Sequence, residues 1–126
     1  MADFSVDGQE RGIGLWRAFV AAAEQDPAIE AAYREVSAGR LVVMRLGVDA
    51  LAERGLLRPG DREQHTATLA LLMGFDPYRL MVLDWGWSRD RLLDWTRHQL
   101  GTLIALPSRE PAGASDGSRR PANQRP

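Results

Sequence analysis

Apolar residues recur along this chain at the spacing of a helix. Between Leu15 and Gln25 they fall at i, i+3, i+4 and i+7, on a face formed by Trp16, Phe19, Val20 and Ala23. The stretch from Pro27 to Glu53 is rich in Ala, Leu, Glu and Arg, which favour helix. We expect one helix in each stretch, divided at Asp26-Pro27 because the residue before a proline avoids the helical conformation. The second helix is long, with or without a bend at Gly39.

Turn residues follow this long helix. Gly55 lies where a left-handed C-cap is expected, and the sequence from Leu56 to Gly60 is typical of a turn. Asp61 suits the N-cap of the next helix, because its carboxylate can accept a hydrogen bond from a free backbone N–H.

Proline and glycine divide the remainder. Pro77 interrupts the hydrogen-bond ladder of the third helix, so we expect a kink there and a second half from Tyr78 to Trp85. Gly86 ends that half, and Ser88 caps a final helix. No alternating β-branched run marks a strand, apart from Leu41–Val43 in a helical context. The predicted fold class is therefore all-α, an orthogonal or antiparallel bundle of four to five helices.

The chain has 126 residues, the size of one domain. Residues 1–12 contain glycine and are expected to form a flexible N-terminal segment. Residues 13–106 are expected to form the helical domain. Residues 107–126 hold no large apolar side chain, so they cannot bury enough surface to offset the entropy of ordering and are expected to be disordered.

Composition excludes several classes of protein. The 16 basic and 17 acidic residues give a net charge of −1, which argues against a nucleic-acid-binding domain. The absence of cysteine excludes disulfide scaffolds, zinc ribbons and thiol nucleophiles. No apolar run spans a bilayer and no secretory signal begins the chain, so a cytoplasmic location without membrane contact is expected.

The two histidines are the strongest candidates for metal chemistry. Asp61 and His65 are spaced i, i+4, as are Asp94 and His98, and such pairs suit several divalent ions. The alternative is that both are exposed pairs on amphipathic helices, which we favour because no third ligand follows. Neither a Gly-x-Ser-x-Gly turn nor a Gly-rich phosphate loop occurs. We therefore expect no enzyme, no catalytic residue, no metal and no cofactor.

Large aromatic and methionine side chains are numerous for so small a fold. They favour an apolar pocket among the first three helices and the start of the fourth, for a small apolar molecule. The candidate lining residues are Trp16, Phe19, Tyr33, Met44 and Met73. The alternative is that these residues fill the core at normal density.

The chain also resembles a known family. Three pieces match in order: Arg40 to Gly55 with Leu57-Arg58-Pro59-Gly60, the helix that ends at Pro77–Val82, and Gly86-Trp87-Ser88 followed by Leu92, Trp95 and Leu100. This combination is similar to the C-terminal effector-binding and dimerisation domain of TetR-type transcriptional regulators, over roughly Leu15 to Leu106. The resemblance implies transcription regulation, binding of a small ligand, and a homodimer.

In that family the segment before Gly-Trp-Ser and the helix after it pair with their copies in a four-helix bundle. The apolar residues available for this contact are Tyr78, Met81, Val82, Trp85, Leu92, Leu93, Trp95, Leu100, Leu103 and Ile104. We expect them to form an isologous dimer interface. The alternative is that the stripe packs wholly inside one subunit.

The N-terminus departs from the family. TetR-type regulators begin with a three-helix DNA-binding unit of roughly 45 residues. About a dozen residues precede the first expected helix here, so we expect no direct DNA contact from this chain. A truncated gene product, a miscalled start and a stand-alone sensor all remain open. The alternative function is a protein-interaction module that pairs with a full-length regulator.

Overall fold

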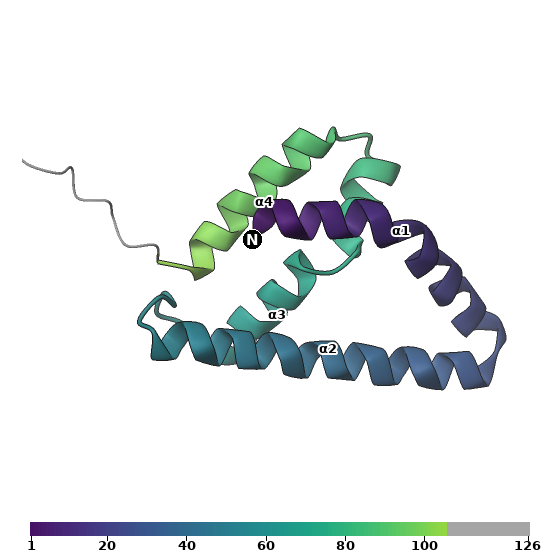
Figure 1. Cartoon of the computed structure of the whole chain (residues 1–126), viewed down its shortest axis with the longest axis horizontal. Helices are drawn as coiled ribbons and strands as arrows, with labels where there is room; N and C mark the ends of the chain where they lie inside the picture. The colour runs from purple at the N-terminus through teal and green to yellow at the C-terminus, as the bar shows by residue number, and fades with distance from the viewer. Residues whose placement is uncertain (106–126) are drawn as a thin grey trace, which may run out of the picture.

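The computed structural model describes residues 1–105, which form five helical elements and no strand. They are α1 (Ala2–Gln25), α2 (Pro27–Glu53), α3 (Arg62–Leu72), the π-helix η1 (Tyr78–Asp84) and α4 (Arg89–Leu103). The predicted all-α class is confirmed. α1 and α2 meet at one turn and diverge from it, and α3 and α4 lie toward the ends far from that turn (Figure 1). The expected disordered tail, residues 107–126, lies outside the described residues.

Several predicted helix boundaries are confirmed. Asp26 is extended (φ −129°, ψ 116°), and its carboxylate accepts a hydrogen bond from the Ala28 N–H at 2.9 Å, which caps α2. α2 then continues through Gly39 to Glu53. The predicted turn over Leu56–Gly60 is present only in part: Arg54 and Gly55 form the turn, Leu57 pairs with Ile104 in an isolated antiparallel bridge, and the chain bends at Pro59 and Gly60.

The caps in the second half agree with the sequence as well. Gly55 and Gly86 adopt φ values of 68° and 71°, in the left-handed region that favours glycine. The Asp61 carboxylate accepts from the Gln64 N–H at 2.8 Å, and the Ser88 hydroxyl accepts from the Arg91 N–H at 3.2 Å. These caps fix the starts of α3 and α4.

The prediction of one helix kinked at Pro77 is wrong in detail. α3 ends at Leu72, and Pro77 (φ −59°) is the N-cap residue of a separate element, η1, which begins at Tyr78; at that position the missing N–H of proline is not needed. The break falls near Gly74, because the buried Gln9 side chain donates hydrogen bonds to the carbonyls of Leu72 and Gly74. Those carbonyls therefore find a partner outside the helix.

The expectation that residues 1–12 are flexible is also wrong. α1 begins at Ala2, and one face of its first turns packs into the core. The buried residues of this face are Ala2, Ser5, Val6 and Gln9, and Val6 is 0% exposed. The glycines of this segment lie within the helix. The burial of this face stabilises the helix by more than the low helix propensity of the glycines costs.

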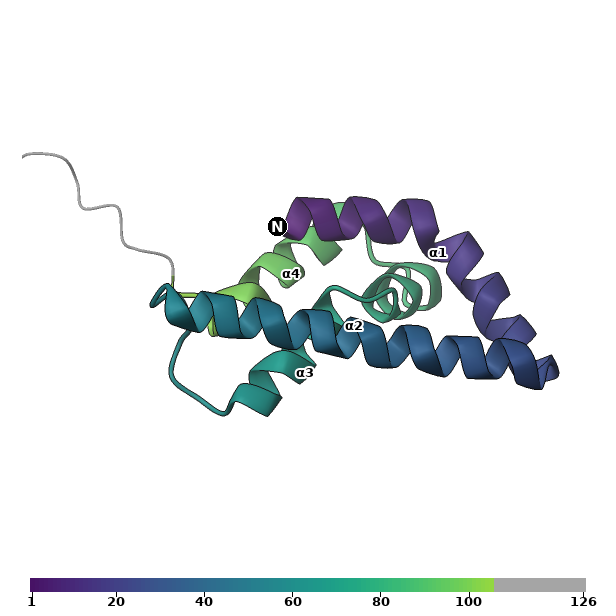
Figure 2. The same cartoon turned by 60° about the horizontal axis from the view of Figure 1, so that its bottom comes forward.

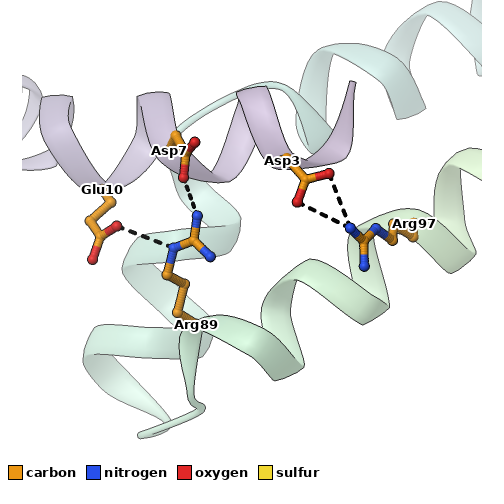
Figure 3. Close-up of polar contacts among 5 residues, drawn as sticks. All are labelled: Asp3, Asp7, Glu10, Arg89 and Arg97. Atoms are coloured by element: carbon orange, nitrogen blue, oxygen red, sulfur yellow. Dashed lines mark hydrogen bonds and ion pairs between the residues drawn. The ribbon is translucent and has the colours of Figure 1, made fainter.

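Ion pairs also hold the first turns of α1 against α4 (Figure 3). The Arg97 guanidinium donates to both carboxylate oxygens of Asp3 at 3.0 Å, and Arg89 lies between Asp7 and Glu10, pairing with both. The hydrogen bond from Arg97 lowers the pKa of the Asp3 carboxyl, and the hydrogen bond to Asp7 raises the pKa of Arg89. The three carboxylates Asp3, Asp7 and Glu10 of α1 thus each pair with an arginine of α4.

Candidate ligand site

Four aromatic rings gather where α1, α2 and the turn after α3 meet. Trp16 is central: its ring centroid lies 5.9 Å from Phe19, 5.6 Å from Tyr33 and 5.1 Å from Phe75, and it stacks on Phe75 with 22° between the planes. Phe19 and Tyr33 are 6.0 Å apart. These separations are those of favourable aromatic pairs. We call this set the aromatic cluster.

A glycine allows this packing. A Cβ atom at Gly12 would lie 2.8 Å from the Phe75 ring, closer than carbon atoms approach without strain. Gly12 therefore lets the Phe75 ring approach the backbone of α1, and that approach brings the ring onto Trp16.

Polar groups surround the cluster. The Arg40 guanidinium carbon lies 5.7 Å from the centroid of the Trp16 ring, a cation–π distance, and its Nη2 donates to the Met73 carbonyl at 3.4 Å. Arg79 lies near Asp76 (3.7 Å) and Asp84 (3.4 Å). Cations and carboxylates thus border an apolar surface.

Two open grooves adjoin the Trp16 ring. One, of about 380 Å³, is lined by Trp16, Tyr33, Asp76 and Arg79 together with the exposed side of α1. The other, of about 250 Å³, adds Arg40 and runs toward Gly74. Trp16, Tyr33 and Asp76 line both grooves, so the two grooves adjoin the same tryptophan ring. The first groove falls within the range of about 300–1,000 Å³ that small-ligand pockets occupy, and the second falls slightly below it.

The five residues predicted to line a pocket separate into two groups. Trp16, Phe19 and Tyr33 come together in the aromatic cluster. Met44 and Met73 instead pack against the hydrophobic core. Met44 and Met73 therefore agree with the alternative interpretation, in which these side chains fill the core.

The predicted dimer stripe is mostly inside the subunit. Tyr78, Leu92, Leu93, Leu100 and Leu103 are all buried within the single chain. Partly buried residues pack against the same core, and they are Met81, Val82, Trp95 and Ile104. These residues are covered because the first turns of α1, which were expected to be flexible, pack against α4.

Trp85 differs from the rest of that stripe. Its side chain is 56% exposed, and it lies 6.1 Å from Trp87, whose ring is covered by the Arg91 guanidinium at 4.2 Å. Five of the ten residues are therefore buried within the single chain, four are partly buried, and Trp85 alone of the ten is exposed.

The histidine–carboxylate pairs have other roles. Asp61 caps α3, and the ring Nε2 of His65 lies 3.0 Å from the Arg58 carbonyl. Asp94 lies 3.7 Å from Arg97. Among residues 1–105 no three His, Cys, Asp or Glu side chains gather as a metal site would require, and no helix in that range is long and apolar enough to cross a membrane.

The sequence analysis missed three polar residues of the site and one aromatic residue. Phe75 was counted among the large aromatic side chains but not placed in the pocket, and Asp76 was interpreted only as the residue before the kink at Pro77. Arg40 was noted only as the start of one piece of the family resemblance, and Arg79 only as part of Pro77–Val82. No pattern in the sequence links these residues; only the structure shows that the Arg40 Nη2 lies 3.2 Å from where a Cβ atom at Gly74 would be.

No family model, no curated protein and no solved structure matches this chain. The site is therefore interpreted from its own geometry.

Proposed function

We propose that this chain is the ligand-sensing domain of a TetR-type transcriptional regulator, and that a small, flat, apolar molecule binds beside Trp16. The observation that carries the proposal is the aromatic cluster with its two flanking grooves. Three residues selected as pocket-lining from the sequence meet there, although they come from two different helices.

The chemistry of the grooves supports a flat ligand. The Trp16 and Tyr33 rings offer planar apolar faces, against which an aromatic or fused-ring molecule can stack. Arg40 and Asp76 lie in the same groove and supply a donor and an acceptor that can orient a polar substituent. The ring faces would contribute most of the affinity and the polar groups most of the selectivity.

Isothermal titration calorimetry with 2-naphthol, a flat fused-ring probe, tests the proposal. Trp16→Leu should raise the Kd by about two- to tenfold, since a lost aromatic stacking contact is worth about 0.5–1.5 kcal/mol. Trp85→Leu is the matched control, because Trp85 is an exposed tryptophan outside both grooves. Absence of binding by the unaltered protein, or an equal loss in both variants, would contradict the proposal.

The second candidate is a protein-interaction module that pairs with a regulator. The observation in its favour is a group of apolar residues on α2 that line one open groove, where Leu41, Val42 and Leu46 are all at least half exposed. Single exposed apolar residues are ordinary, but a contiguous patch marks interaction surfaces. The two candidates are separable, because the patch and the aromatic cluster involve different side chains.

A further inference from the structure

Three consecutive carbonyl groups at the end of α3 are held by side chains of other helices. The Leu72 carbonyl accepts from the Gln9 Nε2 of α1 at 3.0 Å, and the Gly74 carbonyl accepts from the same nitrogen. The Met73 carbonyl between them accepts from Arg40 of α2 at 3.4 Å. Figure 2 shows the turn after α3, residues 73–76, between α1 and α2. Carbonyls at a helix end have no partner within the helix, so these donors fix the path of the turn.

Gln9 is buried although its side chain is polar. It is 2% exposed, and within residues 1–105 its Oε1 atom has no hydrogen-bond partner. An unpartnered buried acceptor lowers the stability of the fold, whereas the two N–H groups of the amide each meet a carbonyl. The Gln9 side chain therefore acts through its donors, and those donors hold the turn after α3.

One face of α1 carries Gln9 together with two residues that contact the aromatic ring of this turn. Gly12 and Trp16 follow Gln9 at i+3 and i+7, the spacing of one helix face. Gly12 leaves room for the Phe75 ring, which lies 2.8 Å from where a Cβ atom would be. Trp16 stacks on that ring at 5.1 Å. Gln9 thus fixes the backbone next to Phe75, and the next two turns of α1 receive its ring.

We propose that Gln9 is a positioning residue of the ligand site: it holds Phe75 on Trp16 and thereby sets the affinity for a flat ligand. This inference rests on the proposed function and deepens it. Phe75 directly follows the Gly74 carbonyl that Gln9 holds, and it lines the groove of about 250 Å³ beside Trp16. Gln9 lines neither groove, so it acts on a ligand only through the turn.

Isothermal titration calorimetry with 2-naphthol gives the first test. Gln9→Met keeps a long, unbranched side chain but removes both donors, so Phe75 loses its fixed place and the Kd should rise about two- to tenfold, the effect of a lost aromatic contact. Val6→Ala is the matched control. Val6 is a buried residue of the same helix that lines neither groove, so its substitution lowers stability and should leave the Kd unchanged.

A double-mutant cycle separates positioning from a general effect on folding. Phe75→Leu removes the ring that Gln9 positions, so adding Gln9→Met to Phe75→Leu should leave the Kd nearly unchanged. Two independent effects would instead multiply. A multiplicative result, or a Kd of Gln9→Met equal to that of the unaltered protein, would overturn the inference.

Gln9→Glu is a milder second variant, which keeps the test open if Gln9→Met does not fold. Glutamate has the same shape, and at about pH 5 burial keeps its carboxyl protonated, so it donates one hydrogen bond instead of two. We expect a Kd between those of the unaltered protein and Phe75→Leu. A Kd equal to that of the unaltered protein would count against the role of the two donors.

The indole N–H signal of Trp16 in a nuclear magnetic resonance spectrum reports the position of Phe75 without ligand. The stacked Phe75 ring contributes a ring-current shift to this signal. Gln9→Met and Phe75→Leu should therefore move the signal in the same direction, and Val6→Ala should leave it in place. An unmoved signal in Gln9→Met would overturn the inference.

The two readouts distinguish the possible failures. If the unaltered protein does not bind 2-naphthol, the proposed function and the effect of Gln9 on affinity fail together, and coincident Trp16 shifts would support only the placement of Phe75 by Gln9. If Trp16→Leu weakens 2-naphthol binding but Gln9→Met does not, the proposed function stands and this inference fails.

Discussion

Val6→Ala tests whether the first turns of α1 belong to the core. Val6 is 0% exposed and belongs to the same buried cluster as Leu92 and Leu100 of α4. The substitution removes two methyl groups, a transfer cost of about 1.6 kcal/mol at ~0.8 kcal/mol each. A cavity that collapses only partly raises the expected loss in the free energy of unfolding to about 2–3 kcal/mol.

Urea denaturation followed by tryptophan fluorescence measures this loss, and a thermal scan should show a decrease in Tm of roughly 10 °C or more. Phe4→Ala is the matched control: Phe4 lies in the same turns of α1, but its side chain is 79% exposed, so its effect should stay within about 0.5 kcal/mol. Equal, small effects for both substitutions would refute the packing of α1 described here.

Four further outcomes are expected. Gly12→Ala should destabilise the fold and alter tryptophan fluorescence, because the added Cβ would collide with the Phe75 ring. Gly14→Ala in the same helix places its Cβ in open space and should stabilise the fold by about 0.5–1 kcal/mol. Urea denaturation measures both effects. Asp61→Ala should cost about 1 kcal/mol through loss of the α3 cap, measured the same way. The lowered pKa of Asp3 stabilises the fold above the pKa of an unfolded Asp, about 4, and this stabilisation is lost as the pH falls through the lower folded pKa. An acid titration should therefore show a smaller change in stability below about pH 4 in Asp3→Asn than in the unaltered protein.

Local chemistry made much of this fold predictable. The break at Asp26-Pro27, the left-handed Gly55 and the caps Asp61 and Ser88 each depend on one or two residues, and all were identified from the sequence. Such signals are strong because the backbone conformation they require is nearly independent of the rest of the chain.

The errors have a common cause in tertiary contacts. Residues 1–12 have weak helix propensity, and only their packing against α4 and the pairing of Asp3 and Asp7 with arginines show why they are ordered. The same packing buries Leu92 and Leu100, which explains why a stripe interpreted as a dimer interface is internal. Periodicity identifies an apolar face but not the element that covers it.

The candidate site was predictable in part. Trp16, Phe19 and Tyr33 were selected from a larger set of aromatic and methionine side chains, and they do meet. Phe75 joins them through a turn whose position depends on Gln9 and the end of α3, which no local pattern reveals.

The most direct test of a ligand site beside Trp16 is the nuclear magnetic resonance spectrum of the indole N–H groups of the four tryptophans, recorded during titration with 2-naphthol. Individual substitutions to phenylalanine assign the four signals. We predict that the Trp16 signal shifts, while those of Trp85, Trp87 and Trp95 remain in place, because these three do not line either groove beside the aromatic cluster. A titration that leaves the Trp16 signal unmoved, or that shifts the other three instead, would contradict the account.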